Sequence, residues 1–499
     1  MKTRIFSMLL IIVMIFATVG MAGYGSSADS TTDSATETAS AADGEDSAAA
    51  GDSDTAADTD AETDETWELV RDAYVYTFPL VLEYATMEKM TNTVTATSVQ
   101  APVNQFIHAA SLATADSTDV VTPNVDTVYS QVWLDLSEDA VVIEKPAADR
   151  YCSIEVMDAY TNCVAILGTG GDTSDACTYL FTGPDYNGEI PDGMTQVSMP
   201  TNMGWIIVRT LCEGTEDLEN VAAIQSELNA YTLTLYQEGG EPAEGTYDED
   251  KNYTPLNYVL SLSPAEYFTL ANDLMNENPP AAEDANAIAS FAEINVGPGL
   301  TFDAGLLGSD SSENWTSMLT SLTAELSEEA AGFIVQNGIW SFYGYPIAEF
   351  GTEYAYRALI ALGGFGANPV SMAMYLKGNM DEDGNQLSGG HSYVLHFEAD
   401  ALPPVEEDGF WSVTVYDSET DALIDNAIDR YCINDRSELQ YNEDGSLDIY
   451  LQAEEPEEDQ LSNWLPVSEG TFHLMLRIYL PAEEASDGTW SAPTITMVE

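Results

Sequence analysis

Two polar side chains stand two residues apart just before an apolar stretch, in the segment VVTPNVDTVYSQVWLDL (residues 120–136). If a strand extends through this segment, Asn124 and Asp126 lie on the same face as the apolar row that follows them. In the functional interpretation, the carboxylate and the amide line the mouth of a cavity, where burial could raise the pKa of Asp126 for proton transfer, so both residues are catalytic candidates. In the alternative interpretation they form an Asx-type turn, whose side chains satisfy backbone groups where Pro123 interrupts the ladder. We favour the turn, because such caps are common where a turn meets a strand.

Arginine inside apolar runs is the second sign of a site. The chain has only 13 Lys and Arg, yet Arg209 lies in WIIVRTL, Arg357 in YAYRALIAL and Arg477 in LMLRIYL. Arginine is rarely buried without a partner, and it binds carboxylates through two parallel hydrogen bonds. One interpretation is a buried ion pair, for example between Asp126 and Arg209. The other is a clamp for an anionic or carbonyl-bearing ligand between two β domains, although ion pairs are the commoner arrangement.

The last apolar strand and the nearby turns add further candidates. His473, Arg477 and Tyr479 share one face of the strand and could line a groove. Trp411 and Asn463 lie close to turns, where an aromatic platform can bind a sugar or an apolar ligand, but where residues more often form the rim of a sandwich core. The candidate ligand-binding residues are therefore Arg209, Arg477, His473, Trp411 and Asn463.

Motifs of the common nucleotide-dependent and metal-dependent enzymes are absent. The sequence has no G-x-S-x-G elbow, H-E-x-x-H helix, phosphate loop or dinucleotide fingerprint. His391 and His396 are an odd number of residues apart on an expected strand, so they should point to opposite faces. The segment 379–390 begins like a calcium loop but has Gly390 where the closing Glu is required, so we expect a plain acidic turn. No metal site is predicted, and the need for a cofactor stays open.

The charge balance excludes several partners. There are 85 Asp and Glu against 13 Lys and Arg, for a formal net charge of -72. Nucleic acid and anionic membrane surfaces are bound through clustered Lys or Arg, which this chain lacks. A small extracellular molecule and a second copy of the chain remain as candidate partners.

The N-terminus has the features of an export signal. Lys2 and Arg4 precede the apolar run IFSMLLIIVMIFATV, and small residues follow it. We expect a signal peptide over residues 1–23, with an uncleaved anchor as the alternative, and an extracellular or cell-surface location. Tyr24 stands where a bacterial lipoprotein carries its lipid-bearing Cys, which argues against a lipoprotein. Residues 24–66 are rich in Ser, Thr, Ala, Asp and Glu and predict a disordered acidic spacer.

Five cysteines form no zinc or redox motif, and four of them fall in one segment. Export permits disulfides, but the odd number leaves at least one thiol free or paired with another chain. Any disulfide is expected within the first β domain. Small buried residues in strands are at least as good an interpretation. The residues are Cys152, Cys163, Cys177, Cys212 and Cys432.

The apolar patterns predict an α+β fold, in which two antiparallel β-sandwich or jelly-roll-like domains are joined by a helical connector. Residues 67–213 contain a helix, broken or kinked near Pro79, and then short strands rich in Val, Ile, Thr, Tyr and Trp. Residues 214–375 have helical periodicity. Strands return over residues 376–499, which form the C-terminal β domain.

Six segments resemble one bacterial family, in the right order along nearly the whole chain after the spacer: APVNQFIHAASL, VVTPNVDTVYSQVWLDL, TNMGWIIVRT, LPPVEEDGFWSVTVYD, NEDGSLDIY and NWLPVSEGTFHLMLRIYLP. It is the two-domain family catalogued as domains of unknown function 1254 and 1214. The resemblance implies two β-sandwich or jelly-roll-like domains linked by helices, in an exported protein. It brings no settled reaction and therefore no catalytic residue. Many members have Arg where Thr122 stands, so this chain departs from the family pattern there.

Two hypotheses of function follow. In the first, the protein is a hydrolase or another small-molecule-binding enzyme, with a site between the two β domains. In the alternative, it is a non-enzymatic binding or structural module of the cell envelope. An unpaired Arg209 or Arg477 in a cleft would favour the enzyme. Arginines that all pair with carboxylates of the chain would favour the module.

Overall fold

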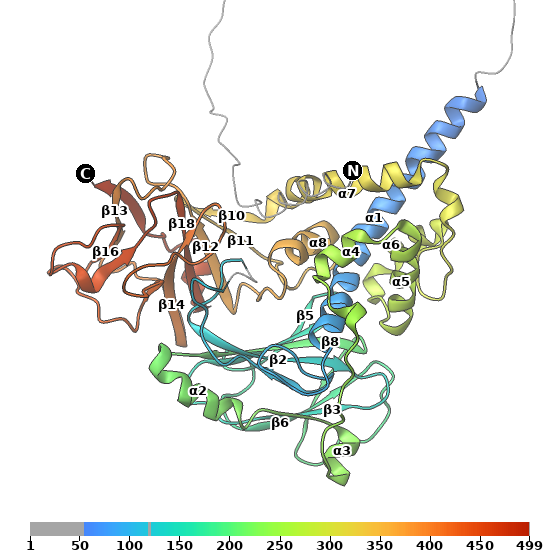
Figure 1. Ribbon diagram of the computed structural model, residues 1–499, viewed down its shortest axis with the longest axis horizontal. Helices are drawn as coiled ribbons and strands as arrows, with labels where there is room; N and C mark the ends of the chain where they lie inside the picture. Colours follow the sequence, from blue (N-terminus) through green and yellow to red (C-terminus); the bar gives the residue numbers. More distant parts are fainter. Residues whose placement is uncertain (1–53, 118–120, 499) are drawn as a thin grey trace, which may run out of the picture.

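The computed structural model describes residues 54–117 and 121–498. In this part of the chain two β domains and a cluster of helices meet at the centre of the molecule (Figure 1). The arrangement confirms the α+β fold with two β-sandwich-like domains and a helical connector. The predicted signal peptide and most of the predicted spacer lie outside the described residues.

The first β domain is a sandwich of two sheets, with the strand orders β1-β2-β8-β4-β5 and β7-β6-β3-β9. The paired strands are antiparallel, except that β6 and β7 are parallel. Alternate apolar residues, among them Val132, Ile143 and Ile206, fill the space between the sheets. The strands are β1 (Phe106–His108), β2 (Thr127–Asp135), β3 (Val141–Lys145), β4 (Cys152–Asp158), β5 (Cys163–Gly168), β6 (Cys177–Thr182), β7 (Thr195–Ser198), β8 (Met203–Leu211) and β9 (Asn229–Thr232).

The C-terminal β domain is a second sandwich, with the strand orders β10-β11-β12-β18-β14-β15 and β17-β16-β13-β19. Its paired strands are antiparallel apart from β16 and β17. Leu395, Val413 and Leu476 are among its core residues. The strands are β10 (Ile334–Asn337), β11 (Trp340–Tyr343), β12 (Ala373–Gly378), β13 (Ser392–Phe397), β14 (Val405–Asp417), β15 (Cys432–Asn434), β16 (Leu447–Gln452), β17 (Trp464–Pro466), β18 (Phe472–Pro481) and β19 (Thr494–Val498).

The helices pack mainly around the long helix α1, which contacts α4, α5, α6 and α8. Helices α2 and α3 lie instead on the first β domain, and α9 follows the last long strand of the C-terminal domain (Figure 1). The helices are α1 (Asp54–Met90), α2 (Leu218–Gln225), α3 (Leu233–Glu238), α4 (Pro255–Ser261), α5 (Pro264–Glu277), α6 (Ala285–Phe291), α7 (Ser311–Glu329), α8 (Tyr354–Gly363) and α9 (Glu483–Ser486). Among the described residues, no helix is long and apolar enough to cross a membrane.

Helix α1 begins at Asp54, inside the segment predicted as a spacer, because Ala and Glu favour helix and acidic residues interact well with a helix N-terminus. The sequence predicts a break or a kink near Pro79. The break is wrong, because the helix continues through Pro79, and the kink stays a prediction. Pro79 removes one backbone hydrogen bond, but Phe78 and Leu80 beside it are fully buried, and this packing holds the helix together.

The two β domains meet along a surface that we call the seam. It is formed by one face of β2, β4 and β8 in the first domain and by β12, β14 and β18 in the C-terminal domain. The ring of Tyr151, at the start of β4, packs edge-on against Phe410 and Tyr479, with centroids 5.3 and 5.7 Å away. These rings share a buried cluster with Leu211 and Met372. The seam therefore joins residues that are far apart in the sequence.

Candidate functional site

The segment before β2 fastens the two domains together. Asn124 Oδ1 accepts a hydrogen bond of 2.7 Å from the backbone N–H of Asp126, as the turn interpretation predicts. The buried Asp126 carboxylate accepts hydrogen bonds from Ser412 Oγ at 2.5 Å and from Arg436 Nη2 at 3.0 Å. We call Asp126, Ser412 and Arg436 the Asp126 contact. Each carboxylate oxygen therefore has a partner from the other domain, although the Nε of Arg436 is buried without a hydrogen-bond partner.

Arg209 pairs with Glu155, so the suggested pair between Asp126 and Arg209 is wrong. Arg209 Nη1 lies 2.6 Å from Glu155 Oε2 and donates also to Asn368 Oδ1 at 2.9 Å. Its Nη2 donates to the Gly366 carbonyl at 2.8 Å. Sheet geometry explains the choice of partner: Glu155 lies on β4, next to β8, and on the same face as Arg209. Asp126 precedes β2 and faces the other domain.

Arg477 is buried without a carboxylate partner among the described residues. Its Nη1 donates to Thr414 Oγ1 at 3.1 Å, and its Nη2 donates to Tyr416 Oη at 2.8 Å and to the Thr122 carbonyl at 2.9 Å. Its Nε has no hydrogen-bond partner, and the residue is 3% exposed. Burial by itself lowers the pKa of Arg477. The nearby Tyr416, Tyr479 and Asp126 raise it by more, so the net shift is upward. The seam therefore holds a buried cation that is bonded only to neutral oxygens.

Three tyrosines of the seam receive hydrogen bonds from side-chain amides. Asn124 Nδ2 lies 2.6 Å from Tyr479 Oη and 3.1 Å from Tyr129 Oη. Asn368 Nδ2 lies 2.8 Å from Tyr375 Oη. Both amides have a fixed orientation, since Oδ1 of Asn124 accepts from a backbone N–H and Oδ1 of Asn368 accepts from a guanidinium. The three phenols therefore act as acceptors in these bonds.

We call Tyr129, Tyr375 and Tyr479 the phenol cluster. An amide nitrogen accepts no hydrogen bond, so none of the three O–H groups can donate to Asn124 or Asn368. No acceptor for them is found among the described residues. Burial raises the pKa of Tyr375 and of Tyr479, so both hydroxyls keep their protons. The phenol cluster therefore consists of donors, and Arg477 adds a positive charge beside it.

The cluster lies between the two buried arginines and is open to solvent at its edge. Both Arg209 and Arg477 act electrostatically on Tyr375. Tyr375 and Arg477 are also direct neighbours across β12 and β18. Tyr129, Tyr375 and Asn124 are each partly exposed. Such an arrangement suits an acceptor group from solution, such as a carboxylate or a carbonyl oxygen.

His473 lies at one end of the C-terminal sheet, in a set that resembles a nucleophilic triad. Its Nδ1 is 3.4 Å from Ser418 Oγ, and its Nε2 is 3.5 Å from Asp421 Oδ1. The Nε2 atom makes no hydrogen bond. Burial, together with Lys377 and Arg477, lowers the pKa of His473 to about 3. So weak a base does not activate a serine hydroxyl near neutral pH, and the set does not support a hydrolase.

The remaining candidates lie away from the seam. Trp411 packs between the two sheets of the C-terminal domain, with its ring 5.4 Å from that of Phe397. Asn463 bonds to the backbone of Gln440 and Asp448 inside the same domain. Both residues therefore have structural partners.

The predicted acidic turn and the cysteines show no site for a metal or disulfide. Asp381 Oδ1 accepts hydrogen bonds from the backbone N–H groups of Asp383 and Asn385, which closes a turn of the predicted kind. In residues 54–117 and 121–498, no group of three His, Cys, Asp or Glu could hold a metal ion. All five cysteines are free thiols. The interpretation of the cysteines as small strand residues therefore fits the structure.

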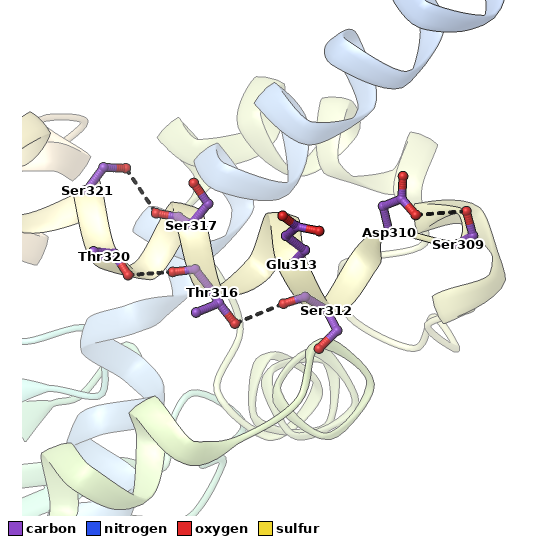
Figure 2. Close-up of a pocket in the computed structure, with 8 residues that line it drawn as sticks. All are labelled: Ser309, Asp310, Ser312, Glu313, Thr316, Ser317, Thr320 and Ser321. Atoms are coloured by element: carbon purple, nitrogen blue, oxygen red, sulfur yellow. Dashed lines mark hydrogen bonds between the residues drawn. The ribbon is translucent and has the colours of Figure 1, made fainter. Parts of the chain in front are cut away.

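A hollow of about 800 Å³ follows the outer face of α7 (Figure 2). All of its lining residues lie between 309 and 321, in one helix and the turn before it. The hydroxyls of Thr316 and Thr320 donate to carbonyls one turn earlier, at 2.9 and 2.7 Å. With these donors used inside the helix and no second element facing them, the hollow is a solvated helix face.

Arg209, Arg477 and Asn124 are candidates from the sequence, and Tyr479 is placed on the face of Arg477, but Tyr129, Glu155 and Tyr375 are not predicted as part of a site. Tyr129 has the opposite parity from Asp126, which suggests packing alone, and Glu155 looks like an ordinary strand residue. Tyr375 falls at the end of the predicted helical connector, whereas it lies in β12. One signal is present in the sequence. Tyr479 shares a face with Arg477, and a tyrosine beside an arginine in an apolar strand brings a polar group into a buried surface.

The fold and the seam define an α+β protein in which two β sandwiches share a polar junction. Residues 103–232 match the family model described as "Protein of unknown function (DUF1254)", and residues 372–483 match "Protein of unknown function (DUF1214)". The chain therefore belongs to the two-domain family of unknown function that its sequence resembles.

One solved structure supports the same fold. The chain is similar to the VPA0106 protein from Vibrio parahaemolyticus, with 23% identity and a TM-score of 0.65, over 87% of this chain and 100% of that one. It is also similar to an uncharacterized protein from Burkholderia cenocepacia, with 13% identity and a TM-score of 0.42, over 89% of this chain and 96% of that one. No curated protein matches the chain.

Proposed function

We propose that the seam binds a small molecule through a carboxylate or carbonyl oxygen. The observation that carries the proposal is the set of donors without acceptors: the three O–H groups of the phenol cluster and the Nε of Arg477. Buried or half-buried donors are nearly always paired. A ligand oxygen that accepts several of these hydrogen bonds satisfies them together.

The distribution of charge supports an anionic ligand. The chain carries a net charge of -72, so its surface repels anions over most of its area. Four of its 13 Lys and Arg nevertheless lie in or beside the strands of the seam: Arg209, Lys377, Arg436 and Arg477. Arg209, Lys377 and Arg436 are each paired with a carboxylate of the chain. Of the four, Arg477 is the cation whose charge remains for an anion from solution.

The proposed role is that of an exported small-molecule-binding protein, in keeping with the predicted signal peptide. Hydrolysis is not part of the proposal, because the Ser418 set lacks a competent base. The alternative, a structural module, has support in the Asp126 contact, which joins the domains. The distinguishing residue is Arg477, which lies in the seam and has no carboxylate partner among the described residues.

Isothermal titration of the purified protein with propionate, pyruvate and benzoate tests the proposal. Tyr375→Phe should weaken the tightest of these by about tenfold or more, because a hydrogen bond to a charged group contributes about 1.5–3 kcal/mol. Tyr356→Phe is the matched control, since its buried hydroxyl donates to the Gly344 carbonyl in the helical layer. Absence of binding by the wild type, or equal binding by wild type and Tyr375→Phe, would contradict the proposal.

A further inference from the structure

A second group of polar atoms lies on the first-domain side of the seam. Glu155 Oε1 and Arg209 Nε are buried and have no hydrogen-bond partner. Tyr151 Oη and Ser153 Oγ are buried too, interact with each other, and bond to no other described residue. The four residues are at most 3% exposed. We call them the Glu155 subsite. A buried acceptor and a buried donor that both lack a partner, on one face of one sheet, indicate a common partner.

The Glu155 subsite adjoins the phenol cluster. Across β4, β8 and β2, Ser153 lies opposite Arg209, and Arg209 lies opposite Tyr129. Neighbouring strands are about 5 Å apart, so these three side chains form one row on one face. A chain of hydrogen bonds also joins Glu155 to Tyr375 through Arg209 and Asn368, with lengths of 2.6, 2.9 and 2.8 Å. The two groups therefore lie side by side, as two parts of one polar region.

The two groups have different hydrogen-bonding character. The phenol cluster and Arg477 offer donors. In the Glu155 subsite, Glu155 Oε1 accepts, Arg209 Nε donates, and the two hydroxyls can do both. A ligand hydroxyl can donate to Glu155 and accept from Arg209 at the same time. An ammonium group would fit less well, because it would meet the Arg209 guanidinium.

We propose that the ligand is a small hydroxycarboxylate, with its carboxylate at the phenol cluster and Arg477 and its hydroxyl at the Glu155 subsite. This inference rests on the proposed function and names its ligand class. It predicts a preference for hydroxy acids over the parent acids, because the parent acids leave the buried atoms of the subsite unpaired.

Titration calorimetry with matched pairs, lactate against propionate and 3-hydroxybutyrate against butyrate, tests the inference. Burial raises the pKa of Glu155 to about 7 against the opposing effect of Arg209, so the titration is run at pH 8, where the carboxylate is ionised. The wild type should bind at least one hydroxy acid about tenfold or more tightly than its parent acid. Ser153→Ala and Glu155→Gln should each reduce that ratio to about twofold or less.

Ser153→Ala removes one hydroxyl and leaves the Glu155–Arg209 ion pair intact, so this variant separates hydroxyl recognition from folding. Ser130→Ala is its control, because Ser130 lies on the opposite face of β2, bonded to His108. Equal binding of both members of each pair by the wild type, or an unchanged ratio in both variants, overturns the inference and leaves the proposed function standing. If no carboxylate binds, both are overturned.

Discussion

The two polar contacts of the seam differ in how their buried charges are balanced. In the Asp126 contact, a buried anion has one hydrogen-bonded partner for each oxygen, Ser412 and Arg436. At the phenol cluster, the buried cation Arg477 is bonded only to neutral oxygens. The Nε atoms of Arg436 and Arg477 both lack a partner, so the two contacts differ in whether a carboxylate is present. One interface can therefore hold a buried carboxylate that is paired on both oxygens and joins the domains, and a buried guanidinium that has no carboxylate partner and is available to a ligand.

The largest expected effect belongs to the Asp126 contact. Asp126→Asn should lower the free energy of unfolding by about 3 kcal/mol or more, because it removes the charged partner of Arg436 in a buried setting. Urea unfolding measures this change. Asp435→Asn is the control: Asp435 pairs with the same arginine but its side chain is 28% exposed, so its loss should cost less than about 1 kcal/mol. Equal losses in the two variants would mean that the Asp126 contact does not hold the domains together.

Ionisation of Glu155 should make the free energy of unfolding depend on pH. Burial raises the pKa of Glu155 in the folded protein to about 7, from the ordinary glutamate value of 4.5, although Arg209 opposes this shift. The folded state therefore holds the proton more firmly, and this contribution to stability is present below about pH 4.5 and is lost as the pH rises through 7. Between pH 4.5 and 8, wild type should lose up to about 3 kcal/mol relative to Glu155→Gln, which cannot ionise. If the curves of unfolding free energy against pH run parallel for wild type and Glu155→Gln, Glu155 does not contribute to the pH dependence of stability.

Arg477→Met should separate stability from binding. Replacing a buried cation that has no carboxylate partner by an apolar side chain of similar length should change the free energy of unfolding by about 1 kcal/mol, in either direction. Carboxylate binding in the titration should be lost. A destabilisation as large as that of Asp126→Asn would make Arg477 structural and would remove the contrast between the two contacts.

The smallest effect on stability is expected for Tyr129→Phe. Asn124 Nδ2 keeps Tyr479 and Thr127 as acceptors at 2.6 and 3.0 Å, so unfolding should change by less than about 0.5 kcal/mol. Carboxylate affinity should nevertheless fall by about tenfold, because one donor of the phenol cluster is gone. If carboxylate binding is unchanged, Tyr129 does not contact the ligand, and only Tyr375 and Tyr479 remain as phenol donors of the site.

Local chemistry made part of this structure predictable from sequence. The apolar pattern identifies the long strands β2, β8, β14 and β18, and the Asx turn at Asn124 follows from residues that are two positions apart. The same pattern does not identify β9, β10 and β11, which lie in the segment predicted as a helical connector. The partners of Asp126 and Arg209 do not follow, because Arg436 and Glu155 are brought there by domain packing and by strand order. Helix α1 likewise passes through Pro79 because tertiary packing overrides a local preference.

The phenol cluster was beyond sequence reasoning for a physical reason. Its tyrosines come from β2, β12 and β18, and its character as a set of donors depends on the orientation of Asn124 and Asn368. Neither the neighbours of these amides nor their orientation is encoded by residue spacing. The sequence signals of a polar seam are Arg209 and Arg477 in apolar runs, Tyr479 on the face of Arg477, and the Asn124–Asp126 pair.

A crystal structure of the protein grown with lactate tests the central claim most directly. The account predicts a carboxylate within hydrogen-bonding distance of Tyr375 Oη and the Arg477 guanidinium, with the phenol O–H groups directed toward it. Lactate found only outside the seam, with Arg477 unchanged and water alone on the phenol hydroxyls, would contradict it.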